Sequence, residues 1–153
     1  MACVCLDTNV LIWGVKQQFT PGQEHMIERT ARFIRHLDKK GVTCVVPAIV
    51  ISELLMPLPL SEHMPFIAMV STSFTVPSFN AVTASFLSKI WQSKKGQVDI
   101  KREEIKFDAM IVATALAARA TCIYSNDPHI AEIALGHLDC KDIPEMPEQE
   151  RFF

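Results

Sequence analysis

The amino-acid sequence predicts an α/β fold in which helices cover both faces of a parallel β-sheet. Short apolar runs rich in β-branched residues alternate along the chain with segments that repeat apolar residues at helical spacing. Strands that are separated by helices pair in parallel, and both faces of their sheet are then buried. At 153 residues, the chain has the length of one ordinary domain.

The first half of the chain carries two of the predicted strands, each followed by a helix. The apolar run 3–6 ends at Asp7 and predicts a buried first strand. The later elements of this half are a helical stretch over 10–15, a turn at Pro21 and Gly22, a helix over 23–39 closed by Gly41, a strand over 42–46, and a helix that starts at Pro47 and ends before Pro57 and Pro59.

The second half completes the predicted domain. Its expected elements are a short helix over 61–71, a strand over 74–76, a helix from Asn80 to Trp91, a polar loop over 93–106, a buried helix over 108–120, a strand over 122–125, a short helix, and a last strand near 140–143. We therefore expect a domain over 1–145, followed by a loose acidic tail over 146–153.

Composition and charge narrow the class of protein. Apolar residues make up 49% and charged residues 21% of the chain, as in globular proteins. The longest apolar runs, 42–51 and 109–118, are shorter than the ~20 residues that span a bilayer, and the N-terminus lacks the pattern of a secretory signal. We expect no membrane contact and a cytoplasmic location. A net charge of −2 excludes a strongly basic nucleic-acid-binding module, but it allows a nuclease.

The cysteines agree with a reducing compartment. There are five, an odd number that cannot all pair, and each lies in a predicted strand. We expect buried, reduced thiols at these positions, which are Cys3, Cys5, Cys44, Cys122 and Cys140.

Of four acidic residues, three occupy positions where an α/β sheet forms its ligand site. Asp7 and Asp127 follow predicted strands, and Glu53 lies about one and a half turns into the helix after the second strand. Asp108 starts the helix that leads into the fourth strand. Such a set of oxygen ligands suits Mg²⁺ or Mn²⁺, which can activate water and neutralise charge on a phosphodiester without a side-chain nucleophile.

Each of these acids also has a plainer interpretation. Asp7, Asp108 and Asp127 could be helix N-caps, a common role for aspartate. Glu53 is harder to explain in that way, because its neighbours are apolar and an unpaired carboxylate among them would be costly. His129, near Asp127, is expected to have a surface or packing role.

Four segments resemble, in order, the motifs of the PIN-domain nucleases, the family of the VapC-like toxin ribonucleases. They are Leu6-Asp7-Thr8-Asn9-Val10-Leu11-Ile12, the run from Val46-Pro47 to Ser52-Glu53-Leu54, the run from Asp108-Ala109 to Thr114-Ala115, and Ser125-Asn126-Asp127. The resemblance spans residues from about 3 to 130. One departure is Ile130, at a position where the family often has an aromatic residue.

The resemblance implies a single three-layer α/β/α domain with a short parallel sheet. It also implies a ribonuclease that hydrolyses single-stranded or structured RNA with Mg²⁺ or Mn²⁺. The acidic ligands would then be Asp7, Glu53, Asp108 and Asp127, and the polar residues that support them Asn9, Ser125 and Thr8. Small PIN proteins are often toxins blocked by an antitoxin protein and often form homodimers, so both kinds of partner are expected here.

Other interpretations of the sequence remain in view. A haloacid-dehalogenase-type phosphatase needs a second acid where Asn9 stands, and a dinucleotide-binding domain needs a glycine-rich turn after the first strand. The serious alternative is a catalytically silent PIN-like binding or scaffolding module. The basic residues around the predicted loop are either phosphate contacts or a solvated charge run; they are Lys94, Lys95, Lys101, Arg102 and Lys106.

Overall fold

The chain folds into four short strands and seven α-helices over the residues that the structure describes. The computed structural model describes residues 2–18, 20–94 and 102–147, and the side chains of these residues other than 102–104. In chain order the elements are β1 (Cys3–Leu6), α1 (Thr8–Gly14), α2 (His25–Lys39), β2 (Thr43–Val45), α3 (Ala48–Leu55), a 3₁₀ turn (Leu60–Glu62), α4 (His63–Ser73), α5 (Ala81–Lys94), α6 (Arg102–Ala117), β3 (Cys122–Tyr124), α7 (Pro128–Ala134) and β4 (Asp139–Lys141).

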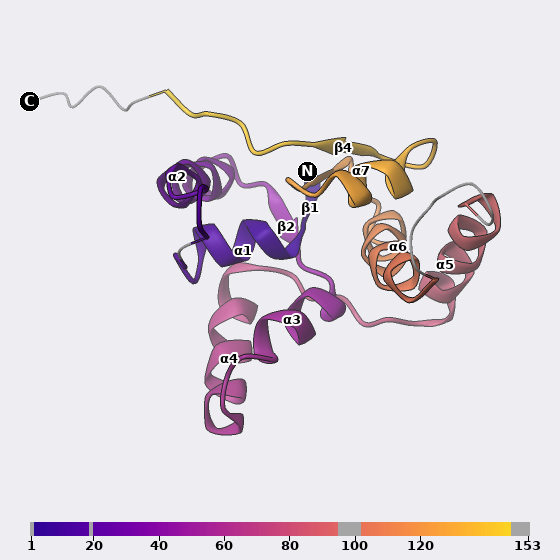
Figure 1. The fold of residues 1–153 in the computed structure, drawn as a ribbon, viewed down its shortest axis with the longest axis horizontal. Helices are drawn as coiled ribbons and strands as arrows, with labels where there is room; N and C mark the ends of the chain where they lie inside the picture. The colour runs from indigo at the N-terminus through magenta and orange to yellow at the C-terminus, as the bar shows by residue number, and fades with distance from the viewer. Residues whose placement is uncertain (1, 19, 95–101, 148–153) are drawn as a thin grey trace, which may run out of the picture.

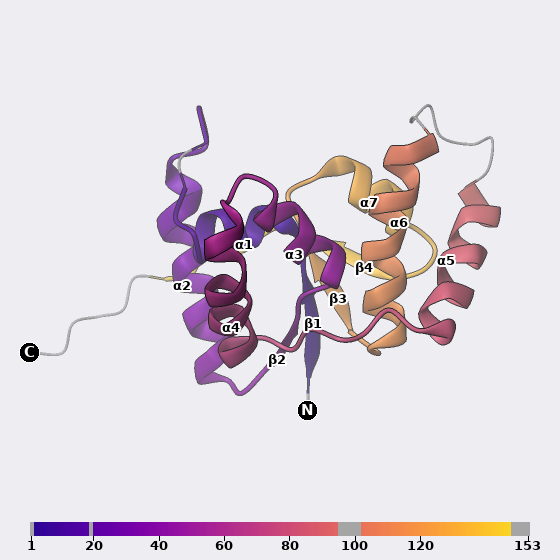
Figure 2. The ribbon, with the colours of Figure 1, turned by 90° about the horizontal axis from the view of Figure 1, so that it is seen from below.

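The four strands form one parallel sheet in the order β2-β1-β3-β4. Helices α1 and α2 lie on one side of this sheet, and α5, α6 and α7 lie on the other (Figures 1 and 2). Helix α3 contacts both α1 and α6. The predicted three-layer α/β/α architecture with a short parallel sheet is therefore confirmed.

The strand order reverses between β1 and β3, at the centre of the sheet. From β1 the chain goes to β2 on one side and returns to β3 on the other. The pairing continues one residue beyond the strands, because the amide of Asp7 donates to the carbonyl of Tyr124 at 3.1 Å. The segments after β1 and β3 therefore leave the sheet side by side, which is where open α/β sheets bind their ligands.

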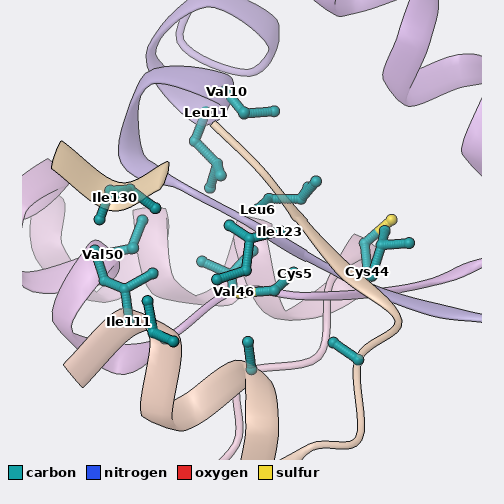
Figure 3. Close-up of a cluster of buried hydrophobic side chains, with 14 of the residues drawn as sticks. Cys5, Leu6, Val10, Leu11, Cys44, Val46, Val50, Ile111, Ile123 and Ile130 are labelled. Atoms are coloured by element: carbon teal, nitrogen blue, oxygen red, sulfur yellow. The ribbon is translucent and has the colours of Figure 1, made fainter. Parts of the chain in front are cut away.

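Apolar side chains fill the space between the sheet and the helices (Figure 3). Cys5, Leu6 and Ile123, from the two central strands, are completely buried. This pattern follows from a parallel sheet that is covered on both faces. All five cysteines are unpaired and lie in strands, as the sequence predicted, but only three of them are buried, and Cys3 and Cys140 are half-buried.

Helix α6 begins earlier than the sequence predicted. Residues 93–106 were expected to form a loop, but α5 continues to Lys94 and α6 starts at Arg102; residues 95–101 lie outside the described part. Ile105 is only 6% exposed and continues the apolar face of Ala109 and Val112 toward the N-terminus. This spacing extends the helix through residues whose charges suggested a loop.

Three other boundaries also differ from prediction. Helix α1 starts at Thr8 rather than Val10, and the expected strand at 74–76 is reduced to one bridge between Thr75 and Val45. The last strand covers Asp139–Lys141, after which the Arg29 guanidinium donates to the carbonyl of the buried Ile143.

The C-terminal end of the chain is described only in part. Most of the predicted tail, residues 146–153, lies outside the described residues. Within the described ranges, no helix combines the length and the apolar character that crossing a membrane requires.

Candidate active site

Asp7 follows β1 directly and is held by two hydrogen bonds. Its Oδ1 accepts from the amide of Thr8 at 2.7 Å, so Asp7 is the N-cap of α1, as one of the two interpretations of the sequence predicted. Its Oδ2 accepts from the Ser125 hydroxyl at 2.6 Å. The side chain is 4% exposed. Asp7 is thus both a cap and a fixed acidic group where the strand order reverses.

Thr8 connects Asp7 to the acidic residue of α3. Its hydroxyl donates to Glu53 Oε2 at 2.9 Å, while its own amide donates to Asp7. Glu53 is half-buried, so it escapes the full cost of an unpaired carboxylate in an apolar interior. The predicted supporting residue Thr8 therefore orients two of the four acids.

Ser125 makes the matching connection on the β3 side. Besides donating to Asp7, its oxygen accepts from the amide of Asp127 at 3.0 Å. Asp127 Oδ1 in turn accepts from the amide of His129 at 2.9 Å and caps α7. Asn9, the third predicted supporting residue, is half-buried in the first turn of α1.

Asp108 comes from within α6 and not from its first residue. The helix begins at Arg102, six residues before Asp108, so the helix start predicted at Asp108 is wrong, and so is the alternative that Asp108 is an N-cap. The pKa of this carboxyl is raised to about 7. Burial is the largest cause, and the charges of Asp127, Asp7 and Glu53 add to it, while His129 acts in the opposite direction.

The pKa values of Asp7 and Glu53 respond to the same surroundings. Burial raises the pKa of Asp7, with a further contribution from Asp127, although the hydrogen bonds from Ser125 and Thr8 act against it. Burial also raises the pKa of Glu53, and the charges of Asp7 and Asp127 add to this effect. Each of these shifts includes repulsion within the group, so the four predicted acids lie within electrostatic reach of one another.

Three of the acids line one cavity. It has a volume of about 400 Å³ and is partly open to solvent. Its lining residues are Ile49, Glu53, Met56, Phe107, Asp108, Asp127 and His129. Asp7 lies behind this lining, joined to Glu53 through Thr8 and to the Asp127 segment through Ser125. A volume of this size is typical of small-ligand sites.

The carboxylates of this site are the type of ligand that binds a hard divalent cation. Carboxylate oxygens are the ligands that Mg²⁺ and Mn²⁺ prefer, and a cation would relieve the mutual repulsion of these acids. Among the described residues, Glu53 Oε1 and Asp127 Oδ2 accept no hydrogen bond. In that same part of the chain, no three Asp, Glu, His or Cys side chains converge tightly enough to hold a metal ion. The carboxylates would have to close around a cation to ligate it.

The remaining residues of the cavity lining were not predicted from the sequence. His129 was expected to have a surface or packing role; it is exposed, but it lines the cavity beside Asp127. Ile49 and Met56 were not considered, although they lie one helical turn before and after Glu53. Phe107 directly precedes Asp108. The short sequence spacing of Ile49, Met56 and Phe107 from Glu53 and Asp108 could have identified them as neighbours of the acids.

Comparison of the whole fold with solved structures gives close matches in architecture. A chain of VapBC2 from Rickettsia felis, bound to a DNA fragment from its promoter, superposes with a TM-score of 0.67 at 15% identity, covering 92% of this chain and 98% of that one. VapBC-1 from nontypeable Haemophilus influenzae gives 0.65 at 17% identity, covering 92% and 97%. A toxin–antitoxin complex from Klebsiella pneumoniae gives 0.62 at 16% identity, covering 94% and 99%. At these identities the likeness concerns the fold.

Comparison of the sequence with models of known protein families identifies the family of this chain. No curated protein matches the chain. The model of the PIN domain family matches residues 4–135, which include all four acids and the strands and helices that carry them. The four motifs predicted the same relationship, and the chain belongs to the PIN domain family.

Proposed function

We propose that this protein is a metal-dependent ribonuclease that hydrolyses phosphodiester bonds in single-stranded or structured RNA. The observation that carries the proposal is the gathering of four carboxylates, from four separate segments of the fold, at the reversal point of the sheet: three line one cavity, and Asp7 is joined to them through Thr8 and Ser125. The protein's membership of the PIN family and its likeness in fold to VapBC structures also support the proposal.

Within this proposal, Asp7, Glu53, Asp108 and Asp127 hold Mg²⁺ or Mn²⁺. A bound cation supplies an activated water and neutralises the charge that builds up on the phosphodiester. The protein holds the carboxylates in place through two hydroxyl groups: Thr8 orients Glu53, and Ser125 joins Asp7 to the segment that carries Asp127. Asn9 is proposed as a further supporting side chain.

Cleavage of a labelled single-stranded RNA with Mg²⁺ or Mn²⁺ tests this function. We expect wild-type cleavage that stops on adding EDTA and falls by roughly two orders of magnitude or more in Asp7→Asn, since metal and acid act together. Asp38→Asn, an exposed acid on α2, is the matched control and should cleave normally. If the wild type cleaves no RNA with either cation, the proposal fails.

The alternative is a catalytically silent PIN-like module that binds or scaffolds. It predicts RNA or protein binding that does not change when Asp7 is replaced. The mutual repulsion of the acids argues against this alternative, because a cluster of carboxylates costs stability unless it serves a purpose such as holding a cation.

We further propose that the protein is the toxin of a toxin–antitoxin pair, as in the VapBC complexes that it resembles in fold. An antitoxin protein encoded beside it and a homodimer in solution are part of this proposal. Co-purification with the product of the neighbouring gene tests the first, and sedimentation of the purified protein tests the second. The cytoplasmic location stays a prediction, which the five unpaired thiols favour.

A further inference from the structure

Part of the lining of the acidic cavity is apolar. It is formed by Ile49 and Met56 from the α3 region and by Phe107 from α6, and we call these three residues the apolar wall. Met56 is 72% exposed and Phe107 is 48% exposed. Exposed large apolar side chains that gather at the rim of a cavity mark a binding surface rather than a packing feature.

The position of the apolar wall restricts what can bind there. Phe107 directly precedes Asp108 on α6, and Met56 lies one helical turn after Glu53, so the wall and the carboxylates belong to the same two elements and the same cavity. A ligand whose phosphate lies at the acids would therefore place a neighbouring group against Phe107. In a nucleic-acid strand that group is a planar base, which stacks well on an aromatic ring.

We propose that Phe107, with Met56 and Ile49 around it, stacks an unpaired base of the RNA strand whose phosphodiester lies at the carboxylates. This inference rests on the proposed ribonuclease function and deepens it, because it makes the site selective for single strands. In a duplex the bases are stacked on one another inside the helix, and their faces cannot reach a protein ring. An unstacked strand can turn one base outward.

The experiment measures binding separately from cleavage. The probe is a fluorescein-labelled single-stranded RNA with phosphorothioate linkages, which resists hydrolysis, and its affinity is read by anisotropy with Mg²⁺ present. The same strand annealed to its complement is the duplex probe. We expect the wild type to bind the single strand more tightly than the duplex. We expect Phe107→Ala to weaken single-strand binding by roughly 5- to 150-fold, the loss of one base stack.

Three further variants make this result specific. Phe107→Trp keeps an aromatic face and should bind within about twofold of the wild type or more tightly. Phe79→Ala removes another exposed phenylalanine, 42% exposed and outside the cavity lining, and should bind as the wild type does. Met56→Ala should weaken binding less than Phe107→Ala, because it leaves the ring in place.

The outcomes separate this inference from the proposed function. If the wild type cleaves RNA and Phe107→Ala binds the single strand as tightly as the wild type, the stacking role is wrong and the ribonuclease stands. If single-strand binding depends on Phe107 but no RNA is cleaved with Mg²⁺ or Mn²⁺, the stacking role stands and the proposed ribonuclease function is wrong. Equal affinity of the wild type for single strand and duplex, or no binding of either, overturns the inference as well.

Discussion

The Asp108 carboxyl is raised in pKa by its own burial and by the charges of three neighbouring acids. In the unfolded chain these influences are absent, and the pKa returns to its ordinary value near 4. Between about pH 4 and pH 7, the folded protein therefore keeps a proton that the unfolded chain releases. The contribution of Asp108 to the free energy of unfolding is largest below this range and is lost as the pH rises through about 7.

This pH dependence of the free energy of unfolding gives a prediction for the metal-free protein. In EDTA, Asp108→Asn should melt at a higher temperature than the wild type at about pH 8, where the wild type carries the unfavourable charge. At about pH 5 the difference should be much smaller, because the folded Asp108 carboxyl is then protonated, and it should disappear below about pH 4, where the unfolded chain keeps this proton as well. Thermal unfolding followed by circular dichroism measures both. The exposed Asp38→Asn is the control, and a variant less stable than the wild type at both pH values would contradict the prediction.

Helix α1 is the element that carries Thr8, and its approach to α2 is unusually close. Gly14 is the last residue of α1, and a Cβ atom placed there would lie 2.4 Å from Ile34 Cδ1 and 2.8 Å from Thr30 Cγ2. Thr30 is completely buried and β-branched, so it has little freedom to move away. Glycine is therefore required at this contact because of space rather than backbone conformation.

We expect Gly14→Ala to lower the free energy of unfolding by about 1–2 kcal/mol, the cost of overpacking less a small gain in helix propensity. Urea unfolding measures this loss. Ile34→Val removes the closest atom, so the double variant should lose less than the sum of the two single losses. Simple additivity in that cycle would show that Ile34 already moves aside without cost.

Element boundaries were predictable where apolar periodicity was strong and uncertain where charges interrupted it. Gly41, with φ of 67°, follows the end of α2 as its place in the sequence indicated, because glycine enters the left-handed region without strain. The start of α6 was missed because Ile105, which is buried in its first turns, lies among charged neighbours in the sequence. The bridge at Thr75 was overestimated as a strand, since local β-propensity does not tell how far a pairing extends.

Over the molecule as a whole, the parallel direction of the strands could be predicted together with the position of the acids, because parallel strands bring their carboxyl ends to one edge, whereas the strand order was not predicted. Asp7 and Asp127 gain their proximity in this way, and Ser125 makes the contact between them. The apolar wall could not be predicted by the same argument. Apolar residues on a helix are usually core, and only the fold shows that Met56 and Phe107 are exposed beside the acids.

The charge balance of the whole molecule leads to a last prediction, on metal binding. The chain has a net charge of only −2, but three acids line its cavity and Asp7 is joined to them through Thr8 and Ser125, while the described cavity lining offers one histidine in return. A cation that binds there stabilises the folded state alone, because the unfolded chain disperses the acids. At a concentration 100 times its dissociation constant, the gain would be about 2.7 kcal/mol.

Mg²⁺ or Mn²⁺ should therefore raise the melting temperature of the wild type, and the rise should be larger at about pH 8 than at about pH 5, where protons compete for Asp108. Asp7→Asn should remove most of this rise, because it takes one acid from the set. Asp38→Asn should keep it, because that acid is exposed on α2, does not line the cavity and does not contribute to the raised pKa of Asp7, Glu53 or Asp108. Calorimetry of each variant with and without the cation makes the comparison. An equal rise in the wild type and in Asp7→Asn would place the bound metal outside the acidic cavity.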